Sequence, residues 1–308
     1  MKGTYMFHRV SRLASVVSTL VVMLAGPYCY GQAGAQVSAT VAKEAFNEGV
    51  KLMQSGSAEA AINMFQTALS NDPEYVDAYL NLGVVFFQLK RYDEALEQFR
   101  KVIEKNPQSV DGYANLGRVQ SKLKRPAEAE EAFRSALTIK SDDPGILAEL
   151  GKVQYVRNAY DTAIQTLEKC HQAGGGDETS YYYLGKAFQK QDKSSQAIAA
   201  LEKSLSFDAK SYNAHFALGQ IYHDQQKYSK AATSFKAAME AEPGKYQASQ
   251  NYAVAMESAD PDAIDANIVN WNAFIRLARN NPKAKNDFAV AEQHVKELQT
   301  RKEALKKQ

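Results

Sequence analysis

The sequence predicts an all-α fold made of repeated helix pairs, and three regularities carry this prediction. Glycine recurs every 34 residues, at Gly49, Gly83, Gly117, Gly151, Gly185 and Gly219. Twelve residues after each glycine stands an alanine, at Ala61, Ala95, Ala129, Ala163, Ala197 and Ala231. Four residues further on comes a bulky apolar side chain, which is Phe65, Phe99, Phe133, Leu167, Leu201 or Phe235. A fixed period in this range indicates a stack of supersecondary units and not one large core.

Six repeats of 34 residues cover 42–245, and they begin at residues 42, 76, 110, 144, 178 and 212. In the second repeat, Leu82 and Phe86 belong to a first apolar stripe with helical spacing, and a second stripe follows a short polar turn. Asp93 in that turn can cap the second helix. Pro107 ends it, because the residue before a proline is disfavoured in the helical conformation. Each repeat is therefore expected to be two antiparallel helices.

These repeats resemble the tetratricopeptide repeat (TPR). The shared positions are an aromatic residue at 4, Leu-Gly at 7 and 8, alanine at 20, phenylalanine at 24 and proline at 32, which the second repeat fills with Tyr79, Leu82, Gly83, Ala95, Phe99 and Pro107. The resemblance implies a right-handed superhelix of helix-turn-helix units, in which the first helices line a concave groove for protein partners. Position 32 departs from the pattern in repeats three to five, where it is Ser141, Gly175 and Ala209.

The run Gly174–Gly176 has the composition of a linker between domains. The 34-residue phase continues through it, so we interpret the run as a flexible joint inside one array. Just before it, Cys170 occupies the position that Ala68 and Val102 fill in other repeats. This register predicts that Cys170 is a small buried hydrophobic residue and not a nucleophile.

After residue 245 the pattern decays. Ala253 keeps the phase of the glycines, and an insertion around 258–263 displaces the helix that follows. We therefore expect a degenerate seventh repeat at 246–283. Residues 284–308 are expected to form a charged C-terminal capping helix, because the ends of a repeat array need a polar outer face.

The first 35 residues have the order of a secretory signal. Arg9 and Arg12 precede an apolar run, and Ala33-Gly34-Ala35 offers a small-residue cleavage site. Residues 1–35 are therefore predicted to be a signal peptide, followed by a short linker at 36–41. The predicted localisation is periplasmic or secreted. The alternative is an uncleaved segment that anchors the chain in the inner membrane, and only then would the protein contact a membrane.

Position 6 of the repeats is expected to face the groove, and it is asparagine three times in succession, at Asn47, Asn81 and Asn115. Each amide has two donors and one acceptor, which suits the backbone of an extended peptide. The sequence therefore suggests a row of amides for peptide binding. The alternative is that Asn-Leu-Gly is simply the common form of this repeat.

A basic and aromatic stretch follows in the middle of the array. Position 9 carries Arg118, Lys152 and Lys186 in consecutive repeats, and such a stripe suits carboxylates of a partner. Tyrosines gather in the same region, and those expected in the groove are Tyr155, Tyr182 and Tyr183. The alternative is a solvated face whose charges pair with acids of the chain itself.

No motif indicates catalysis. The sequence has no glycine-rich phosphate loop, no His-Glu-x-x-His and no paired-cysteine spacing, so we predict no catalytic residue, no cofactor and no metal. The formal net charge of +2 includes Lys2, Arg9 and Arg12, and without them it is 2 − 3 = −1. This nearly neutral array gives no reason to expect nucleic acid as a partner.

These observations lead to a non-enzymatic scaffold as the predicted function. It would bind an extended peptide or a partner subunit, with acidic character favoured by the basic stripe, in an assembly of the cell envelope. The second hypothesis is a membrane-anchored accessory or regulatory subunit of an enzyme complex.

Overall fold

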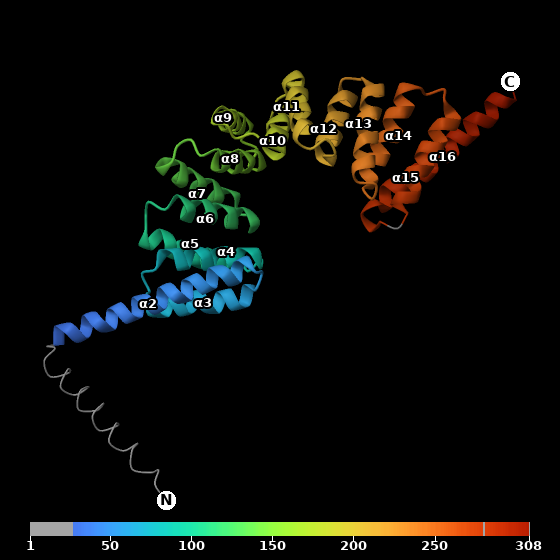
Figure 1. The fold of residues 1–308 in the computed structure, drawn as a ribbon. Helices are drawn as coiled ribbons and strands as arrows, with labels where there is room; N and C mark the ends of the chain where they lie inside the picture. Colours follow the sequence, from blue (N-terminus) through green and yellow to red (C-terminus); the bar gives the residue numbers. More distant parts are fainter. Residues whose placement is uncertain (1–26, 280, 308) are drawn as a thin grey trace, which may run out of the picture. The chain divides into compact units, whose positions relative to one another are not determined.

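The computed structural model describes residues 27–279 and 281–307, and within these ranges it contains α-helices, one 3-10 turn and no strand (Figure 1). The all-α prediction is confirmed. The first helices of successive repeats are α2 (Pro27–Gln54), α4 (Val76–Gln88), α6 (Val110–Lys122), α8 (Pro144–Val156), α10 (Glu178–Lys190), α12 (Tyr212–Asp224) and α14 (Tyr246–Ala259). The second helices are α3 (Ala58–Asn71), α5 (Tyr92–Lys105), α7 (Pro126–Ile139), α9 (Tyr160–Gln172), α11 (Ser194–Phe207), α13 (Tyr228–Ala241) and α15 (Ile264–Ala278). The turn η1 (Pro282–Ala284) then leads into α16 (Lys285–Lys306).

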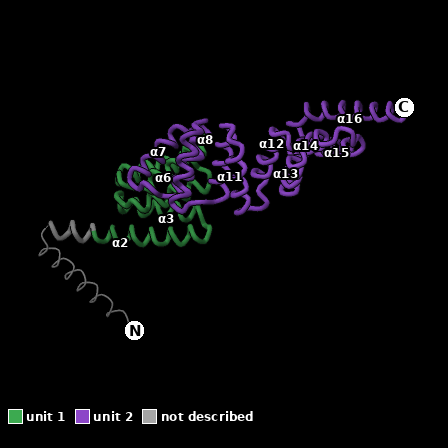
Figure 2. Tube along the Cα trace, turned by 90° about the horizontal axis from the view of Figure 1, so that it is seen from above, with its two compact units in different colours: residues 1–124 green, residues 125–308 purple. Residues whose placement is uncertain are grey.

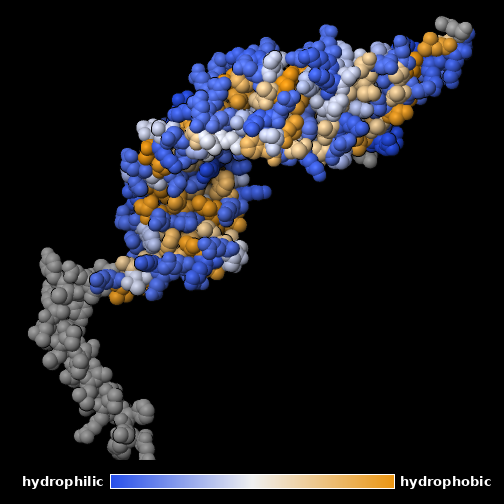
Figure 3. Space-filling view, turned by 45° about the horizontal axis from the view of Figure 1, so that its top comes forward, coloured by the Kyte–Doolittle hydropathy of each residue, from blue (hydrophilic) through white to orange (hydrophobic). Residues whose placement is uncertain are grey.

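The chain divides into two compact units, residues 1–124 and 125–308 (Figure 2). Each helix of a unit packs against its neighbours in the sequence, and first helices of adjacent repeats also touch, as α4 touches α6 and α8 touches α10. On the face shown in Figure 3, hydrophobic residues form several patches among hydrophilic ones. We call the units the N-terminal and the C-terminal unit.

The residues that mark the period form the core. Ala95, Phe99 and their equivalents in the other repeats are almost completely buried. The large residue at position 24 packs directly on the glycine at position 8: a Cβ on Gly219 would lie 2.6 Å from the ring of Phe235, and one on Gly151 would lie 2.5 Å from Leu167. The glycines are thus explained by close helix packing inside each repeat.

A second regularity lies in the turn between the two helices of a repeat. Gly56 has a positive φ, and at the same position the later repeats place non-glycine residues with φ between 57° and 62°, namely Lys90, Lys124, Asn158, Asp192 and Gln226. At Lys90 the geometry is a Schellman motif, because the Lys90 amide donates to the carbonyl of Phe87 and the Arg91 amide donates to that of Phe86.

The predicted linker at 36–41 is wrong as a structural assignment. These residues lie inside α2, because the stretch contains no glycine or proline to end a helix. The Ser38 hydroxyl donates to the carbonyl of Asn71 at 2.5 Å, which ties this part of α2 to the end of α3. Of the predicted signal segment, residues 1–26 lie outside the described residues, and 27–35 belong to α2.

The Gly174–Gly176 run is a packed turn. Gly174 has φ +82°, and a Cβ on Gly175 would lie 2.2 Å from Cβ of Pro144. The Cys170 thiol donates to the carbonyls of Gly175 and Pro144 at 2.9 and 3.2 Å. These contacts explain the glycines sterically, and the flexible joint stays a prediction. Cys170 itself is 1% exposed, as its register predicts.

The C-terminal region continues the helix pairs. Residues 246–283 contain α14 and α15, and 284–308 contain α16. Ala253 is buried at the glycine position of α14. Ala291, Val295 and Leu298 of α16 are buried as well, and the first two belong to a cluster with Phe274.

Candidate functional site

In the N-terminal unit, the predicted asparagines lie at equivalent positions of α2, α4 and α6. Asn47 is exposed. The Asn81 amide donates to the carbonyl of Asp77, one turn back in its own helix, at 2.8 Å. Asn115 accepts a hydrogen bond from the Arg118 guanidinium at 3.0 Å. Two of the three amides therefore have partners in their own helix, which gives position 6 a local structural role beside any role in binding.

Sequence reasoning missed an apolar row beside these asparagines. Positions 5, 9 and 12 of the first two repeats carry partly buried hydrophobic residues, which are Phe46, Val50, Met53, Leu80, Val84 and Phe87. They pack against the core of the N-terminal unit and keep part of their surface exposed. Comparing positions 5, 9 and 12 across the repeats would have revealed the row.

In the C-terminal unit, the structure brings Lys152 together with two predicted tyrosines. The Lys152 ammonium lies 5.8 Å from the centre of the Tyr183 ring, within the range of a cation–π contact. The Tyr183 ring lies 5.4 Å from that of Tyr155, on the neighbouring first helix α8. Lys152 also lies 4.0 Å from the Glu149 carboxylate, so the pairing with an acid of the chain is present but long.

Tyr182 is partly buried and lies next to Tyr183. Its ring lies 5.2 Å from that of Tyr183. Burial, together with the neighbouring Tyr155, Tyr183 and Glu178, raises the pKa of its hydroxyl to about 12. Tyr155, Tyr182 and Tyr183 are all partly buried and pack against the same hydrophobic cluster, so each keeps part of its ring exposed.

Lys186 lines a polar cavity of about 430 Å³ with residues of α10, α12 and α14, among them Lys190, Asp224 and Asn251. Its ammonium donates to the Gln189 side chain at 2.6 Å. Burial lowers the pKa of Lys186, the nearby Lys190 lowers it further, and Asp224 only partly opposes both. Two lysines and two acids, Asp192 and Asp224, line the cavity, and the Lys186 ammonium is only partly solvated there.

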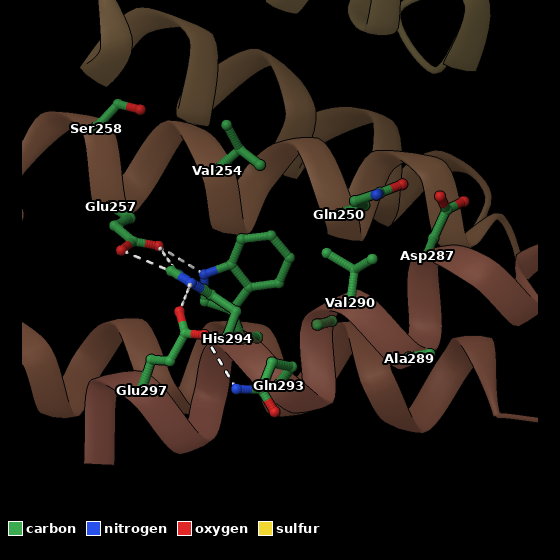
Figure 4. Close-up of a pocket in the computed structure, with 12 residues that line it drawn as sticks. Gln250, Val254, Glu257, Ser258, Asp287, Ala289, Val290, Gln293, His294 and Glu297 are labelled. Carbon is green, nitrogen blue, oxygen red and sulfur yellow. Dashed lines mark hydrogen bonds and ion pairs between the residues drawn. The ribbon is translucent and has the colours of Figure 1, made fainter. Parts of the chain in front are cut away.

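A larger pocket, of about 710 Å³, lies between α14 and α16 and contains none of the predicted site residues (Figure 4). Val254 of α14 and Val290 of α16 lie between polar groups at either end (Figure 4). The sequence carried no sign of it, because the pocket depends on how α16 packs against α14, after the 34-residue period has ended.

Glu257 is the centre of the hydrogen bonds in this pocket. The Trp271 indole donates to Glu257 Oε2 at 2.7 Å, and His294 Nε2 lies 2.8 Å from the same oxygen. His294 Nδ1 lies 3.9 Å from the Glu297 carboxylate. Among residues 27–279 and 281–307, no group of three or more His, Cys, Asp or Glu could hold a metal ion.

The sequence matches two protein-family models. The tetratricopeptide repeat model matches residues 46–110 and 91–144. A model described as anaphase-promoting complex, cyclosome, subunit 3 matches residues 156–238. These segments carry the glycine, alanine and large apolar positions that pack together in the structure.

The chain belongs to the tetratricopeptide repeat family. This confirms the resemblance seen in the sequence and the predicted fold class. TPR proteins are typically scaffolds for protein–protein interaction and generally bind protein partners.

Solved TPR structures share this fold. A chain of the Cut9–Hcn1 hetero-tetramer of the APC/C superposes with a TM-score of 0.59 at 21% identity, covering 70% of this TPR protein but only 43% of that chain. YrrB, described as a TPR protein with an unusual peptide-binding site, gives a TM-score of 0.53 at 21% identity, covering 65% of this chain and 97% of YrrB. PilF of Pseudomonas aeruginosa gives 0.57 at 21% identity, with 70% and 96% covered.

No curated protein matches the sequence of this TPR protein significantly. At about one identical residue in five, the structural likeness shows the fold alone. None of the described helices has both the length and the hydropathy that crossing a bilayer requires.

Proposed function

We propose that this TPR protein is a non-enzymatic scaffold that binds an extended, acidic segment of a partner protein along the first helices of its C-terminal unit. The residues that make the contacts are Lys152, Tyr155, Tyr183 and Lys186, with the Tyr182 ring beside that of Tyr183. The observation that carries the proposal is the partly buried ammonium of Lys186 in a polar cavity, beside a tyrosine-rich surface.

The electrostatics favour a carboxylate on the partner. Burial has already removed much of the water around Lys186; Asp224 partly opposes the resulting shift in its pKa, and Asp192 also lines the cavity. A partner carboxylate that enters the cavity would offset this desolvation, and its hydrogen bond to the ammonium would be charge-assisted. Lys190 lines the same cavity and adds a second ammonium.

The tyrosines supply contact area. Tyr155 and Tyr183 form a tilted pair from adjacent helices, and Lys152 lies over one face of Tyr183. Tyrosine gives a large, rigid surface at little cost in side-chain entropy. The pair can therefore hold the backbone and apolar side chains between the acidic groups of the segment.

The N-terminal unit provides a surface of different character. There the asparagines Asn47, Asn81 and Asn115 accompany the partly exposed apolar row, and Arg118 pairs with Asn115. We propose that this surface takes a more apolar part of a partner. The description of YrrB as having a peptide-binding site is consistent with peptide binding by this fold.

We also propose that the protein is exported and works in an assembly of the cell envelope. The support is the order of the N-terminal sequence, with basic residues, an apolar run and the small residues Ala33-Gly34-Ala35. The test is the intact mass of the protein recovered from its native host. Loss of residues 1–35 supports export, and a full-length mass supports the anchored alternative.

The binding proposal is tested with the double variant Lys152→Glu/Lys186→Glu. A partner is first identified by crosslinking pull-down from native cells, and its affinity for both proteins is then measured. We expect the variant to bind at least tenfold more weakly, with wild-type binding that weakens as salt is added, because the contacts are ionic.

The matched control is Lys210→Glu/Lys236→Glu, which makes the same change in net charge at two exposed lysines outside both cavities. This control should bind like the wild type. If the groove variant keeps full affinity while its circular dichroism is unchanged, the acidic-segment proposal is wrong.

A further inference from the structure

The pocket between α14 and α16 has an apolar wall that nothing within the described chain fills. Val254, Val290 and Trp271 line it. Val290 is 70% exposed although it lies on the wall of a cavity of about 710 Å³. Cavities of this size with apolar walls and a few polar groups are typical of binding sites.

Three of the residues that line this pocket are acidic. Glu257, Asp287 and Glu297 line it, and none of the described lining residues is a lysine or arginine. His294 is the lining residue that can become cationic, and it already lies 2.8 Å from Glu257. At neutral pH the pocket therefore carries an excess of negative charge, whereas the neighbouring cavity has Lys186 and Lys190 together with Asp192 and Asp224.

The acidic end is held in place before any partner arrives. The Trp271 indole and His294 both contact the Glu257 carboxylate, and the Trp271 and His294 rings meet edge to face at 5.1 Å. In Figure 4, Glu257, His294 and Glu297 point toward one another at one end of the pocket, with Val254 and Val290 beside them. Glu257 is therefore already paired within the chain, and Asp287 and Glu297 are the other carboxylates that line the pocket.

The pocket lies on the same row of positions as the proposed groove. Gln250, Val254 and Glu257 are at positions 5, 9 and 12 of the seventh repeat, as Tyr182, Lys186 and Gln189 are in the fifth. On α14 the two cavities are adjacent, because Asn251 lines one and Gln250 lines the other. A segment that follows the first helices therefore reaches this pocket next.

We propose that the pocket is a second binding site, which receives an apolar side chain of a partner polypeptide that has a lysine or arginine directly beside it. The apolar side chain packs on Val254, Val290 and Trp271, and the cation pairs with Asp287 or Glu297. That the occupant is a polypeptide rests on the proposed function; the place and the chemistry of the site do not. The acidic pocket thus fixes where the cationic part of the segment lies.

Trp271 provides the readout, because it is the one tryptophan in the sequence. The full chain is titrated with the blocked peptide Gly-Ser-Leu-Arg-Ser-Gly at constant pH while tryptophan emission is recorded. We expect a saturable change. Two matched peptides, with glutamate in place of arginine or serine in place of leucine, should bind at least fivefold more weakly.

Two variants test the walls of the pocket separately. Val290→Ser removes an exposed apolar contact, and Asp287→Asn/Glu297→Gln removes two negative charges. Each should weaken binding of the Leu-Arg peptide at least fivefold with unchanged circular dichroism. Val269→Ser and Glu240→Gln/Glu303→Gln make the same changes at exposed residues that do not line the pocket, and they should bind like the wild type.

The proposal is overturned if the glutamate peptide binds as well as the arginine peptide, or if no saturable change occurs. It is also overturned if blocked leucine amide alone binds as tightly, since the site would then be one for small molecules. The Lys152→Glu/Lys186→Glu variant separates the two proposals. If this variant binds the Leu-Arg peptide like the wild type and also binds the acidic partner with unchanged affinity, only the proposed function is wrong.

Discussion

A Cβ placed on Gly83 would lie 2.6 Å from Cε1 of Phe99, so the two residues fit together only because Gly83 has no side chain. Phe99 is 1% exposed, so its ring is enclosed by the core of the N-terminal unit. The same relationship recurs along the chain with phenylalanine or leucine as the larger member.

Gly83→Ala is expected to lower the free energy of unfolding. Overpacking of a core costs about 1–3 kcal/mol. The higher helix propensity of alanine offsets about 1 kcal/mol of this cost at most. Urea unfolding followed by circular dichroism measures the difference. Gly244→Ala is the control, because a Cβ there meets nothing within 4 Å. Equal stability of the two variants would contradict the packing argument.

Phe99→Ala should destabilise the N-terminal unit by about 3–5 kcal/mol, since it removes a fully buried ring and leaves a cavity. Phe99→Leu should cost clearly less, because Leu167 and Leu201 fill the same position and are completely buried in their own repeats. Thermal unfolding of both variants tests the order. If leucine proves as costly as alanine, position 24 is more specific than the repeats suggest.

Gly174→Ala and Gly175→Ala are both expected to destabilise the turn, but for different physical reasons. Gly175→Ala would place a Cβ 2.2 Å from Cβ of Pro144, which is overpacking. Gly174→Ala meets no atom within 4 Å but must adopt φ +82°, which costs about 1 kcal/mol. Hydrogen exchange around residues 170–180 should accelerate in both variants. Unchanged exchange would favour the flexible joint instead.

Protonation of the Glu130 carboxylate is expected to lower the free energy of unfolding at acidic pH. Burial alone raises the pKa of Glu130, but hydrogen bonds from Arg134 and Arg157 outweigh it and hold the pKa below 4.5. This contribution is therefore fully present above about pH 4.5 and is lost as the pH falls through the folded pKa. Glu130→Gln should be roughly 1 kcal/mol less stable at pH 7, a modest figure because both arginines are partly solvated.

The measurement for Glu130→Gln is a series of urea titrations from neutral to acidic pH. The difference from the wild type should shrink as the pH approaches and passes below the folded pKa. A difference that stays constant with pH would mean that the Glu130 charge is not the cause.

The repeated positions could be predicted from sequence because one physical demand recurs at each of them. Gly83, Phe99 and Cys170 all lie where the period places them, in close contact between helices. The family follows from the same residues. The extent of α2 was harder to predict. This helix continues through the predicted linker at 36–41, because no residue there interrupts it.

Less of the candidate site than of the fold could be predicted from the sequence. Lys152 and Tyr183 are in contact, as their positions in the repeat suggest. The hydrogen bond from the Asn81 side chain to the carbonyl of Asp77 depends on a rotamer, which a sequence pattern does not specify. The pocket between α14 and α16 was missed for another reason. It arises where Glu257 and His294, 37 residues apart, come into contact, and this spacing falls outside the 34-residue period.

The turns inside the repeats have a consequence for how this protein could change over time. Lys90, Lys124 and Gln226 hold a left-handed backbone that glycine adopts freely and that costs other residues about 1 kcal/mol. In the repeats that contain these three residues, a single substitution by glycine would therefore add stability outside the proposed contact residues. Lys90→Gly should raise the melting temperature, and such changes could compensate destabilising mutations in the groove as it acquires new specificity. The array is therefore well suited to evolve new binding one repeat at a time.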